Sequence, residues 1–235
     1  MIRHPIGILG GMGPEATILL QRKIISAVPA RDDKDHIPLL IDMNPQVPSR
    51  IEHLIEGTGE NPSSTLAKMA RRLEIAGAAA LAMPCNTGHF YAKSIVSAVN
   101  IPFLNMIELA VRHALTTLEP GSTVGILASP AVQHTRQFED LLERGGLSVV
   151  WPKDENGVLS AIRAIKISGP CLSACNTLLA ASTELAGKGA TFQFIACSEF
   201  SLISESVAPG VHAVDTVDLL AQAIVEFDGS RSAGI

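Results

Sequence analysis

Two cysteines stand in similar local sequences about half a chain apart. Cys85 lies in the segment MPCNT (83–87) and Cys197 in the segment ACSE (196–199). Each follows an apolar run and precedes a helix-like stretch, so helix N-terminal amides are expected to stabilise each thiolate. A single cysteine of this kind is commonly a small core residue. Two at corresponding positions favour chemistry instead, in which a thiolate takes a proton from carbon and a thiol returns one.

Short matches elsewhere extend this correspondence into an internal repeat. They occur in the same order with offsets of 118, 112 and 110, and they join residues 7–9 to 125–127, 82–86 to 194–198, and 101–108 to 211–218. Such a repeat predicts two related halves. Open α/β sheets place ligands beyond the carboxyl ends of their strands, so each half would hold one thiol at such an end. If the halves face each other, Cys85 and Cys197 would meet across a cleft.

A glycine-rich segment follows the first predicted strand. Residues 10–16 read GGMGPEA, in which glycine permits close backbone approach and proline suits the first turn of a helix. Free amides and the helix dipole favour an anion there, so Gly11 and Met12 are expected to line a carboxylate site. The segment also fits a loose dinucleotide-binding pattern, but Asp32 and Asp33 lie in a polar loop and do not suit the ribose contact. A simple tight turn is the other alternative.

Two cations and one histidine are further candidates. Arg50 ends the segment NPQVPSR (44–50), whose two prolines would position a guanidinium that can bind a carboxylate through two hydrogen bonds; the alternative is a solvated surface group. Lys166 ends an apolar helical stretch, where its default role is to compensate the helix dipole. His89 follows Cys85 by four residues and could activate that thiol, as in cysteine hydrolases. The second half has no matching histidine, which argues against this role.

The remaining cysteines and histidines give no metal-binding pattern. Cys171 and Cys175 have i, i+4 spacing on a predicted helix, but no further Cys or His motif nearby would complete a site. We interpret both as buried small side chains. The seven histidines likewise show no ligand spacing, so no metal is expected.

Apolar β-branched runs alternate with amphipathic stretches, which indicates βα units around parallel sheets. Strands are expected at 5–9, 38–43, 78–83, 101–104, 123–128, 147–151, 192–196 and 211–214. Helices are expected at 14–28, 63–77, 88–99, 107–118, 131–145, 156–166, 170–188, 199–207 and 216–227. The predicted fold is α/β, with two pseudo-symmetric three-layer domains, each a largely parallel sheet flanked by helices, and the active site in the cleft between them. The first domain would comprise 1–102 plus 211–235 and the second 103–210, with a polar tail from 228 that frays.

Composition excludes several classes of protein. The net charge is −5, whereas binding to nucleic acid or an anionic membrane needs concentrated Lys and Arg. The longest uncharged stretches contain Pro, Gly, Asn or His and do not predict a membrane span. Without an export signal the expected compartment is the cytoplasm, where the four cysteines stay thiols.

At these motifs the chain resembles the aspartate/glutamate racemase superfamily, and most closely its aspartate racemase branch. The resemblance rests on the segments GILGGMGP (7–14), NPQVPSR (44–50), PCNT (84–87) and CSE (197–199), and it covers nearly the whole chain. It implies cofactor-independent racemisation by Cys85 and Cys197, a small acidic amino acid as substrate, and a homodimer. The substrate-binding residues that it implies are Gly11, Met12, Asn44, Gln46, Arg50, Asn86, Thr87, Ser129, Lys166, Ser198 and Glu199.

Within this set the resemblance also implies individual roles. Arg50 and Lys166 match the basic pair for the distal carboxylate of the substrate, and Asn86, Thr87 and Ser198 match residues that hold its α-carboxylate. Three positions depart from the family pattern: Ala196 and Ser198 stand where the family has Gly and Thr around the cysteine, and Ser129 replaces a threonine. Ser198 keeps a hydroxyl, but the shape of the pocket changes, so the sequence specifies the reaction more firmly than the substrate.

The sequence therefore predicts interconversion of L- and D-aspartate, or of glutamate, by two-base proton transfer at Cα. The same fold could instead serve maleate isomerisation, broad-specificity amino-acid or hydantoin racemisation, or malonate-type decarboxylation. Paired thiols argue against the decarboxylase, and Arg50 with Lys166 argues against a neutral hydantoin. A dicarboxylate-binding protein without turnover is the alternative from another class, and an NAD-linked oxidoreductase ranks below it.

Overall fold

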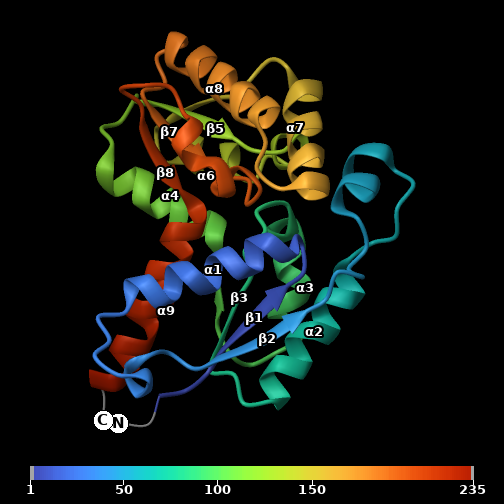
Figure 1. Ribbon diagram of the computed structural model, residues 1–235, viewed down its shortest axis with the longest axis vertical. Helices are drawn as coiled ribbons and strands as arrows, with labels where there is room; N and C mark the ends of the chain where they lie inside the picture. Colours follow the sequence, from blue (N-terminus) through green and yellow to red (C-terminus); the bar gives the residue numbers. More distant parts are fainter. Residues whose placement is uncertain (1–2, 234–235) are drawn as a thin grey trace. The chain divides into compact units, whose positions relative to one another are not determined.

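The computed structural model describes residues 3–233 and divides into two compact units (Figure 1). The first unit is Met1–Met106 with Val217–Ile235, and the second is Ile107–Thr216. Each contains one four-stranded, entirely parallel sheet flanked by helices. The predicted α/β class with two sheets is confirmed.

The first unit is built around the sheet β2-β1-β3-β4. Its strands are β1 (Ile6–Gly10), β2 (Leu39–Met43), β3 (Ala80–Ala82) and β4 (Phe103–Leu104). Its helices are α1 (Pro14–Ala27), α2 (Ser63–Ile75), α3 (Ala92–Val96) and α9 (Thr216–Ala233), with short turns η1 (Asp33–Asp35), η2 (Glu52–Glu56) and η3 (Thr87–Tyr91). All residues of β1 and β3 are buried, as expected for inner strands covered on both faces.

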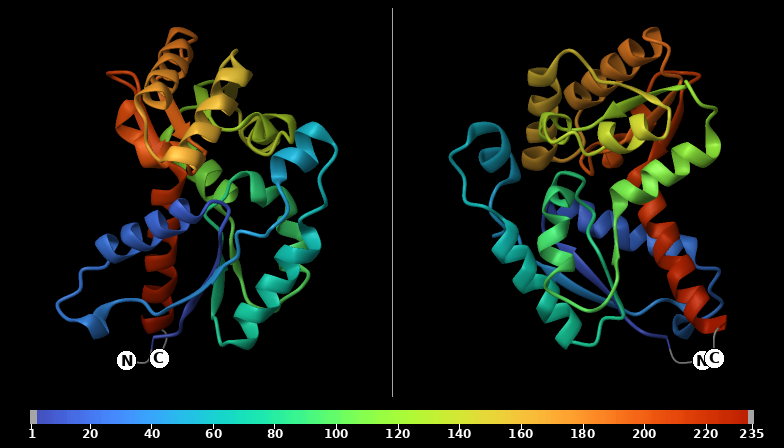
Figure 2. Two further views of the ribbon diagram at one scale, coloured as in Figure 1. Left: turned by 45° about the vertical axis from the view of Figure 1, so that its right-hand side comes forward. Right: turned by 180° about the vertical axis from the view of Figure 1, so that it is seen from behind.

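Helices α1 and α9 cover one face of this sheet, and α2 with α3 cover the other (Figure 1). Pro14 starts α1, where its missing N–H removes no helical hydrogen bond. Ala16, Leu20 and Ile24 recur every four residues and are buried, which gives α1 its inner face. Figure 2 shows α1 crossing α9 in both views, and a Lys23–Asp218 ion pair of 2.6 Å links them.

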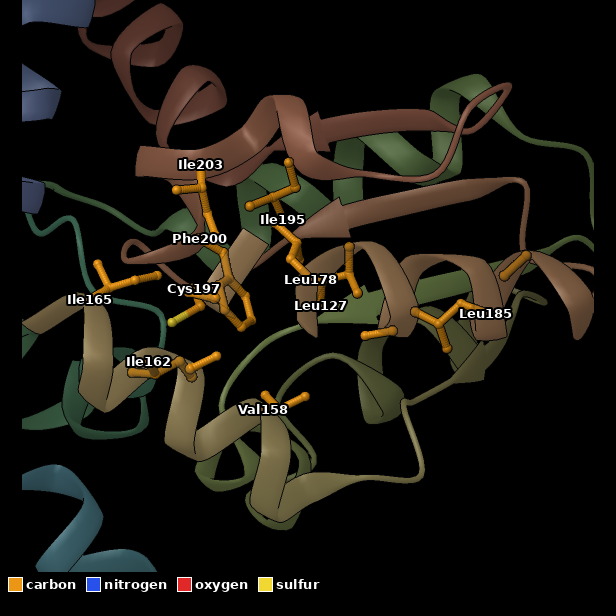
Figure 3. Close-up of a cluster of buried hydrophobic side chains, with 14 residues drawn as sticks. Leu127, Val158, Ile162, Ile165, Leu178, Leu185, Ile195, Cys197, Phe200 and Ile203 are labelled. Carbon is orange, nitrogen blue, oxygen red and sulfur yellow. The ribbon is translucent and has the colours of Figure 1, made fainter. Parts of the chain in front are cut away.

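The second unit has the corresponding strand order, β6-β5-β7-β8. Its strands are β5 (Thr123–Leu127), β6 (Ser148–Val150), β7 (Phe192–Ile195) and β8 (His212–Asp215). Its helices are α4 (Met106–Thr117), which starts in the first unit, α5 (Pro130–His134), α6 (Glu139–Arg144), α7 (Glu155–Ser168), α8 (Leu172–Gly187) and η4 (Phe200–Ser206). Figure 3 shows part of its core, where aliphatic residues of α7 and α8 pack under Ile195, Cys197 and Phe200.

The two sheets share a strand order and an equivalent buried glycine, which agrees with the predicted repeat. Gly7 of β1 and Gly125 of β5 each lie where a Cβ would crowd three side chains. Those three are Leu81, Ala78 and Leu73 for Gly7, and Gln193, Ala190 and Leu185 for Gly125, each of the second set lying 112 positions after its counterpart. The matching GIL segments therefore reflect the same packing constraint in both sheets.

The chain crosses between the units slightly later than predicted. The predicted boundaries at 102/103 and 210/211 assign β4 to the second domain and β8 to the first. In the structure β4 pairs with β3 of the first sheet and β8 with β7 of the second. Each edge strand completes its own sheet before the chain leaves, so both crossings occur at helix starts, after Met106 and after Thr216.

Two expectations about helices also differ from the structure. The helix predicted at 131–145 is two helices, α5 and α6, because Arg136 adopts a positive φ of 51° that interrupts the helical ladder. The tail does not fray at 228: α9 continues to Ala233, and Asp228 is buried and paired with Arg3 at 3.2 Å. Residues 234–235 of that tail lie outside the described residues.

Cys171 and Cys175 are only partly buried, contrary to expectation. Both pack at the margin of the second unit's core. Cys171 has extended backbone angles and precedes α8, so the two thiols do not both lie inside one helix. Within the described residues, no helix combines the length and the apolar character that a membrane crossing requires.

Candidate active site

The first candidate thiol lies in a tight turn directly after β3. Cys85 is 6% exposed, and its N–H donates to the carbonyl of Met83 at 2.9 Å. The N–H of Gly88 donates to Cys85 Sγ at 3.3 Å, so the sulfur is a hydrogen-bond acceptor in this contact. A Cβ on Gly88 would come within 3.0 Å of the Met83 side chain, and glycine therefore allows the amide to approach the sulfur.

His89 lies next to this turn, and both of its ring nitrogens have hydrogen-bond partners. Nδ1 lies 2.8 Å from the carbonyl oxygen of Cys85, and Nε2 accepts the N–H of Met106 at 3.0 Å. A carbonyl can only accept, so Nδ1 carries the ring proton and Nε2 offers its lone pair. Burial lowers the pKa of His89 to about 4, which keeps the ring neutral near pH 7. Neither nitrogen is available to take the Cys85 proton, so the hydrolase-like activation considered from sequence has no support in this geometry.

The segment 44–50 folds back on itself and places Arg50. Asn44 Oδ1 accepts the N–H of Gln46 at 3.0 Å, and Asn44 Nδ2 contacts the Met69 sulfur at 3.6 Å. Arg50 Nη1 donates to the carbonyls of Val47 and Pro48 at 3.3 and 2.9 Å, whereas its buried Nε has no hydrogen-bond partner. The proline-rich segment is thus held by its own polar side chains, and Gln46 points to solvent.

The glycine-rich segment is arranged more tightly than an open anion loop. Gly11 has a φ of 91°, and a Cβ there would collide with the backbone of Asn44. Its N–H donates to Thr17 Oγ1 at 3.0 Å, so this amide is already used within the fold. Met12 is buried with its side chain in the apolar cluster that also holds Cys85. Gly11 therefore serves the close approach of two loops, which places the segment 44–50 beside the start of α1.

Tyr91 belongs to the same cluster, although the sequence did not indicate it. The side chain is 3% exposed, and its hydroxyl is buried without a hydrogen-bond partner. Burial raises the pKa of Tyr91 to about 12, while the nearby positive charge of Arg50 acts in the opposite direction. It is the chain's single tyrosine and forms part of no motif, so only the folded arrangement relates it to Cys85 and Arg50.

The second candidate thiol has a different set of partners. Cys197 is 7% exposed, and its Sγ donates to Glu199 Oε2 at 3.1 Å. Glu199 Oε1 in turn pairs with Lys166 Nζ at 3.0 Å, and Ser198 Oγ lies 3.5 Å from Oε2. Burial first, and then the adjacent Glu199 charge, raise the pKa of the Cys197 thiol well above its usual value. This thiol holds its proton near neutral pH.

The remaining predicted residues lie around these two groups. In the first unit Asn86 is buried and Thr87 is partly buried at the start of η3, directly after Cys85. In the second unit Ser129 is buried at the start of α5, after the carboxyl end of β5. The structure thus gathers Met12, Arg50 and Tyr91 with Cys85 in the first unit, and Lys166, Ser198 and Glu199 with Cys197 in the second. Among residues 3–233 no group of three or more His, Cys, Asp or Glu is arranged to hold a metal ion.

Comparisons with known proteins identify the family of the chain. The family model described as Asp/Glu/Hydantoin racemase matches residues 9–224. The broad specificity amino-acid racemase RacX of Bacillus subtilis (strain 168) is 23% identical over 228 residues, which cover 94% of this chain and 96% of RacX.

Solved structures show the same fold over nearly the full length. The aspartate racemase of Picrophilus torridus is 27% identical with a TM-score of 0.85, and the match covers 96% of this chain and 94% of that one. The glutamate racemase of Francisella tularensis subsp. tularensis SCHU S4, solved with D-glutamate, is 18% identical with a TM-score of 0.69. That match covers 98% of this chain and 82% of the other, and it concerns the fold alone.

Proposed function

Because the chain belongs to the Asp/Glu/Hydantoin racemase family and is thereby an isomerase acting on amino acids, we propose that it racemises aspartate through Cys85 and Cys197. The observation that carries the proposal is the pair of thiols at equivalent positions with opposite hydrogen-bond roles. Cys85 Sγ accepts a backbone N–H, whereas Cys197 Sγ donates to a carboxylate. One sulfur is thus arranged as a base and the other as an acid, which is the division of labour that a two-base reaction requires.

The proposed reaction moves two protons and needs no oxidant. The Cys85 thiolate removes the α-proton of one enantiomer, and the electron pair of the C–H bond passes into the carboxylate as an enediolate. The Cys197 thiol then gives its proton to the opposite face of Cα, so the product is the other enantiomer. The protein is left with a Cys85 thiol and a Cys197 thiolate, the starting arrangement for the reverse reaction. A pair of cysteines supplies both steps, and the proposal therefore includes no cofactor.

Charged and polar groups beside each thiol favour an acidic substrate. We assign the distal carboxylate to Arg50 and Lys166, and the α-carboxylate to Asn86, Thr87 and Ser198, with Ser129 lining the second unit's part of the site. Arg50 has a buried Nε donor to offer, and donors aimed at the carboxylate stabilise the charge that develops on it. Lys166 is paired with Glu199, so a substrate carboxylate would compete with that contact.

The test is incubation with L-aspartate in D2O, followed by chiral separation and mass spectrometry. Two-base transfer predicts D-aspartate that carries deuterium at Cα. Cys85→Ala and Cys197→Ala should each abolish racemisation, whereas Cys175→Ala, on a partly buried thiol outside both groups, serves as the matched control. Racemisation that persists in either of the first two variants would contradict the two-thiol mechanism.

A broader substrate range is the second candidate, favoured by the similarity to RacX, a broad specificity amino-acid racemase. A panel of acidic and neutral amino acids in the same assay distinguishes the two. An aspartate racemase would act on aspartate far faster than on neutral amino acids, because Arg50 and Lys166 would lack a second carboxylate to bind. Comparable rates on neutral amino acids would favour broad specificity.

A further inference from the structure

The arrangement of His89 points to a role that its type and spacing alone do not indicate. Resting on the proposed function, we propose that His89 is a positioning residue, a neutral imidazole protonated on Nδ1 that fixes the Cys85 turn to the first residue of α4. It acts on the reaction through Cys85 and touches no substrate.

The donor and acceptor requirements leave one arrangement of the ring. Cys85 O must accept and Met106 N must donate, and the ring meets both needs only with its proton on Nδ1. In a protonated ring Nε2 would also carry a hydrogen, and two N–H donors would then face each other, Nε2–H and the Met106 N–H. The ring is 5% exposed and stacks on Phe103 with centroids 5.2 Å apart, so water is a poor substitute for either partner.

The two bonds join the thiol turn to the point where the chain leaves the first unit. Met106 is the first residue of α4 and the last residue of the first unit before the chain crosses into the second. Cys85 lies four residues before His89 on an irregular turn, whose backbone has few ladder bonds to fix it. The imidazole therefore supplies a rigid connection between the catalytic turn and the end of the edge strand β4.

The second unit has a different polar side chain at the equivalent position, and its single hydroxyl proton is donated towards the second crossing. Ser201 lies 112 positions after His89, and its Oγ is 3.4 Å from the Cys197 carbonyl and donates to Asp215 Oδ1 at 2.8 Å. Asp215 ends β8, directly before the second crossing at Thr216. Thr216 Oγ1 also donates to Ile195 O at 3.1 Å. In each unit the polar side chain four residues after the thiol thus has a hydrogen-bond partner at or directly before a crossing point, Met106 for His89 and Asp215 for Ser201. This recurrence favours a positioning role for His89 over an accidental contact.

Two substitutions of His89 distinguish a role in positioning Cys85 from a role in packing alone. His89→Gln keeps one donor and one acceptor, whereas His89→Leu keeps volume and removes both. We expect His89→Leu to lower kcat for aspartate by about 100-fold or more with little change in KM, since small misplacements of a reacting group cost this much. His89→Gln should retain kcat within about tenfold. The equilibrium constant between enantiomers is one, so kcat/KM must fall equally in both directions.

A second readout does not depend on racemisation. The rate of iodoacetamide alkylation at Cys85, followed by peptide mass spectrometry, should change by roughly fivefold or more in His89→Leu, while that of Cys197 stays constant. Ser201→Ala should affect Cys197 and leave Cys85 unchanged. Trypsin places Cys85, Cys197 and the pair Cys171/Cys175 on three different peptides, so each rate is measured separately. The 15N shifts of His89 should show a protonated Nδ1 and a bare Nε2.

Each outcome decides the proposal. A ring protonated on Nε2, or wild-type kcat and alkylation in His89→Leu, would overturn it. If His89→Leu does not fold, the ring shifts and His89→Gln decide, and a loss of kcat by 100-fold in folded His89→Gln would count against the donor–acceptor role. If the wild-type protein racemises nothing while the alkylation differences and ring shifts hold, the proposed function fails and the positioning role stands.

Discussion

The two thiols differ in their partners more than in their burial. Both cysteines are nearly inaccessible, yet the Cys85 sulfur accepts a hydrogen bond from a backbone N–H, whereas the Cys197 thiol donates one to Glu199. A buried carboxylate that accepts the S–H bond stabilises the thiol over the thiolate, since the thiolate would place two negative charges together. At the residue scale, Glu199 is therefore the group that makes the pair unequal.

Replacing Glu199 should make Cys197 easier to ionise. Glu199→Gln removes the negative charge and the carboxylate acceptor, so the pKa of Cys197 should fall. We expect the pH profile of Cys197 alkylation to move to lower pH by about one pH unit or more. Lys166→Met is the matched control, because the Lys166 charge lowers the same pKa and its removal should move the profile the opposite way. A profile unmoved by Glu199→Gln would contradict this account.

Tyr91 offers a second prediction at this scale. Its hydroxyl is buried without a partner, and such a group costs free energy that its removal can recover. Tyr91→Phe should leave the free energy of unfolding unchanged or raise it by about 1 kcal/mol, measured by urea denaturation. If the hydroxyl is retained for the substrate, KM for aspartate should rise severalfold in the same variant. A clear loss of stability would show that the hydroxyl has a partner within the fold.

At the scale of elements, the link from the Cys85 turn to α4 makes stability depend on pH. The pKa of His89 is about 4 in the folded chain and about 6.5 when unfolded. Above pH 6.5 both forms are neutral and the ring has no effect. Between pH 6.5 and 4 only the unfolded chain takes up the proton, so stability falls with decreasing pH, by about 3 kcal/mol in total.

The comparison with His89→Gln isolates this contribution. Glutamine does not titrate, so the difference in unfolding free energy between the two proteins should change between pH 7 and pH 4 by an amount of that order. Groups other than His89 titrate in both proteins, so their contributions to the unfolding free energy cancel in the difference. A difference that stays constant over this range would mean that the folded ring titrates as it does in the unfolded chain.

Elements were predictable where a local pattern determines them. The eight strands found in residues 3–233 lie where apolar runs indicated them. The signal is clearest for inner strands such as β1 and β3, which are buried on both faces. The helix at 131–145 was predicted as one piece, since its apolar spacing continues through Arg136 and does not reveal a positive φ there. The polar tail similarly concealed the Arg3–Asp228 pair, which joins residues from opposite ends of the sequence.

The paired glycines give an element-scale prediction about the repeat. Gly7→Ala would bring a Cβ within 2.8 Å of Leu81, and Gly125→Ala would bring one within 2.9 Å of Gln193. Both should destabilise the protein by about 1–3 kcal/mol, as overpacked cores do. Gly187→Ala is the control, because α8 has open space at that position and alanine favours helix. Urea unfolding of the three variants tests this, and a tolerated Gly7→Ala would refute the shared constraint.

At the scale of the whole molecule, motif and site were predictable to different extents. The sequence alone indicates both thiols, Arg50 and Lys166, because each lies in a segment that can be recognised without the structure. The orphaned Tyr91 hydroxyl, the occupied nitrogens of His89 and the Lys166–Glu199 pair depend on residues brought together only by folding. Sequence motifs show which ionisable side chains are present. Their hydrogen-bond partners in the folded chain determine which of these side chains can give or take a proton.

The two-unit construction leads to a prediction that neither unit alone could satisfy. A variant that keeps one thiol can still remove and return a proton on one face of Cα. In D2O, Cys197→Ala should therefore incorporate deuterium into one enantiomer of aspartate without inverting it, and Cys85→Ala should do the same for the other enantiomer. Exchange is measured by mass spectrometry after chiral separation, with the double variant as the blank.

The pattern of exchange distinguishes one shared substrate from two independent sites. If both thiols act on the same Cα, the two variants must choose opposite enantiomers, because each thiol then meets one face of that carbon. The same enantiomer exchanging in both variants would mean that the thiols do not flank one substrate. Because Cys197 must ionise for exchange in Cys85→Ala, its raised pKa predicts that exchange in this variant increases as the pH rises above neutrality.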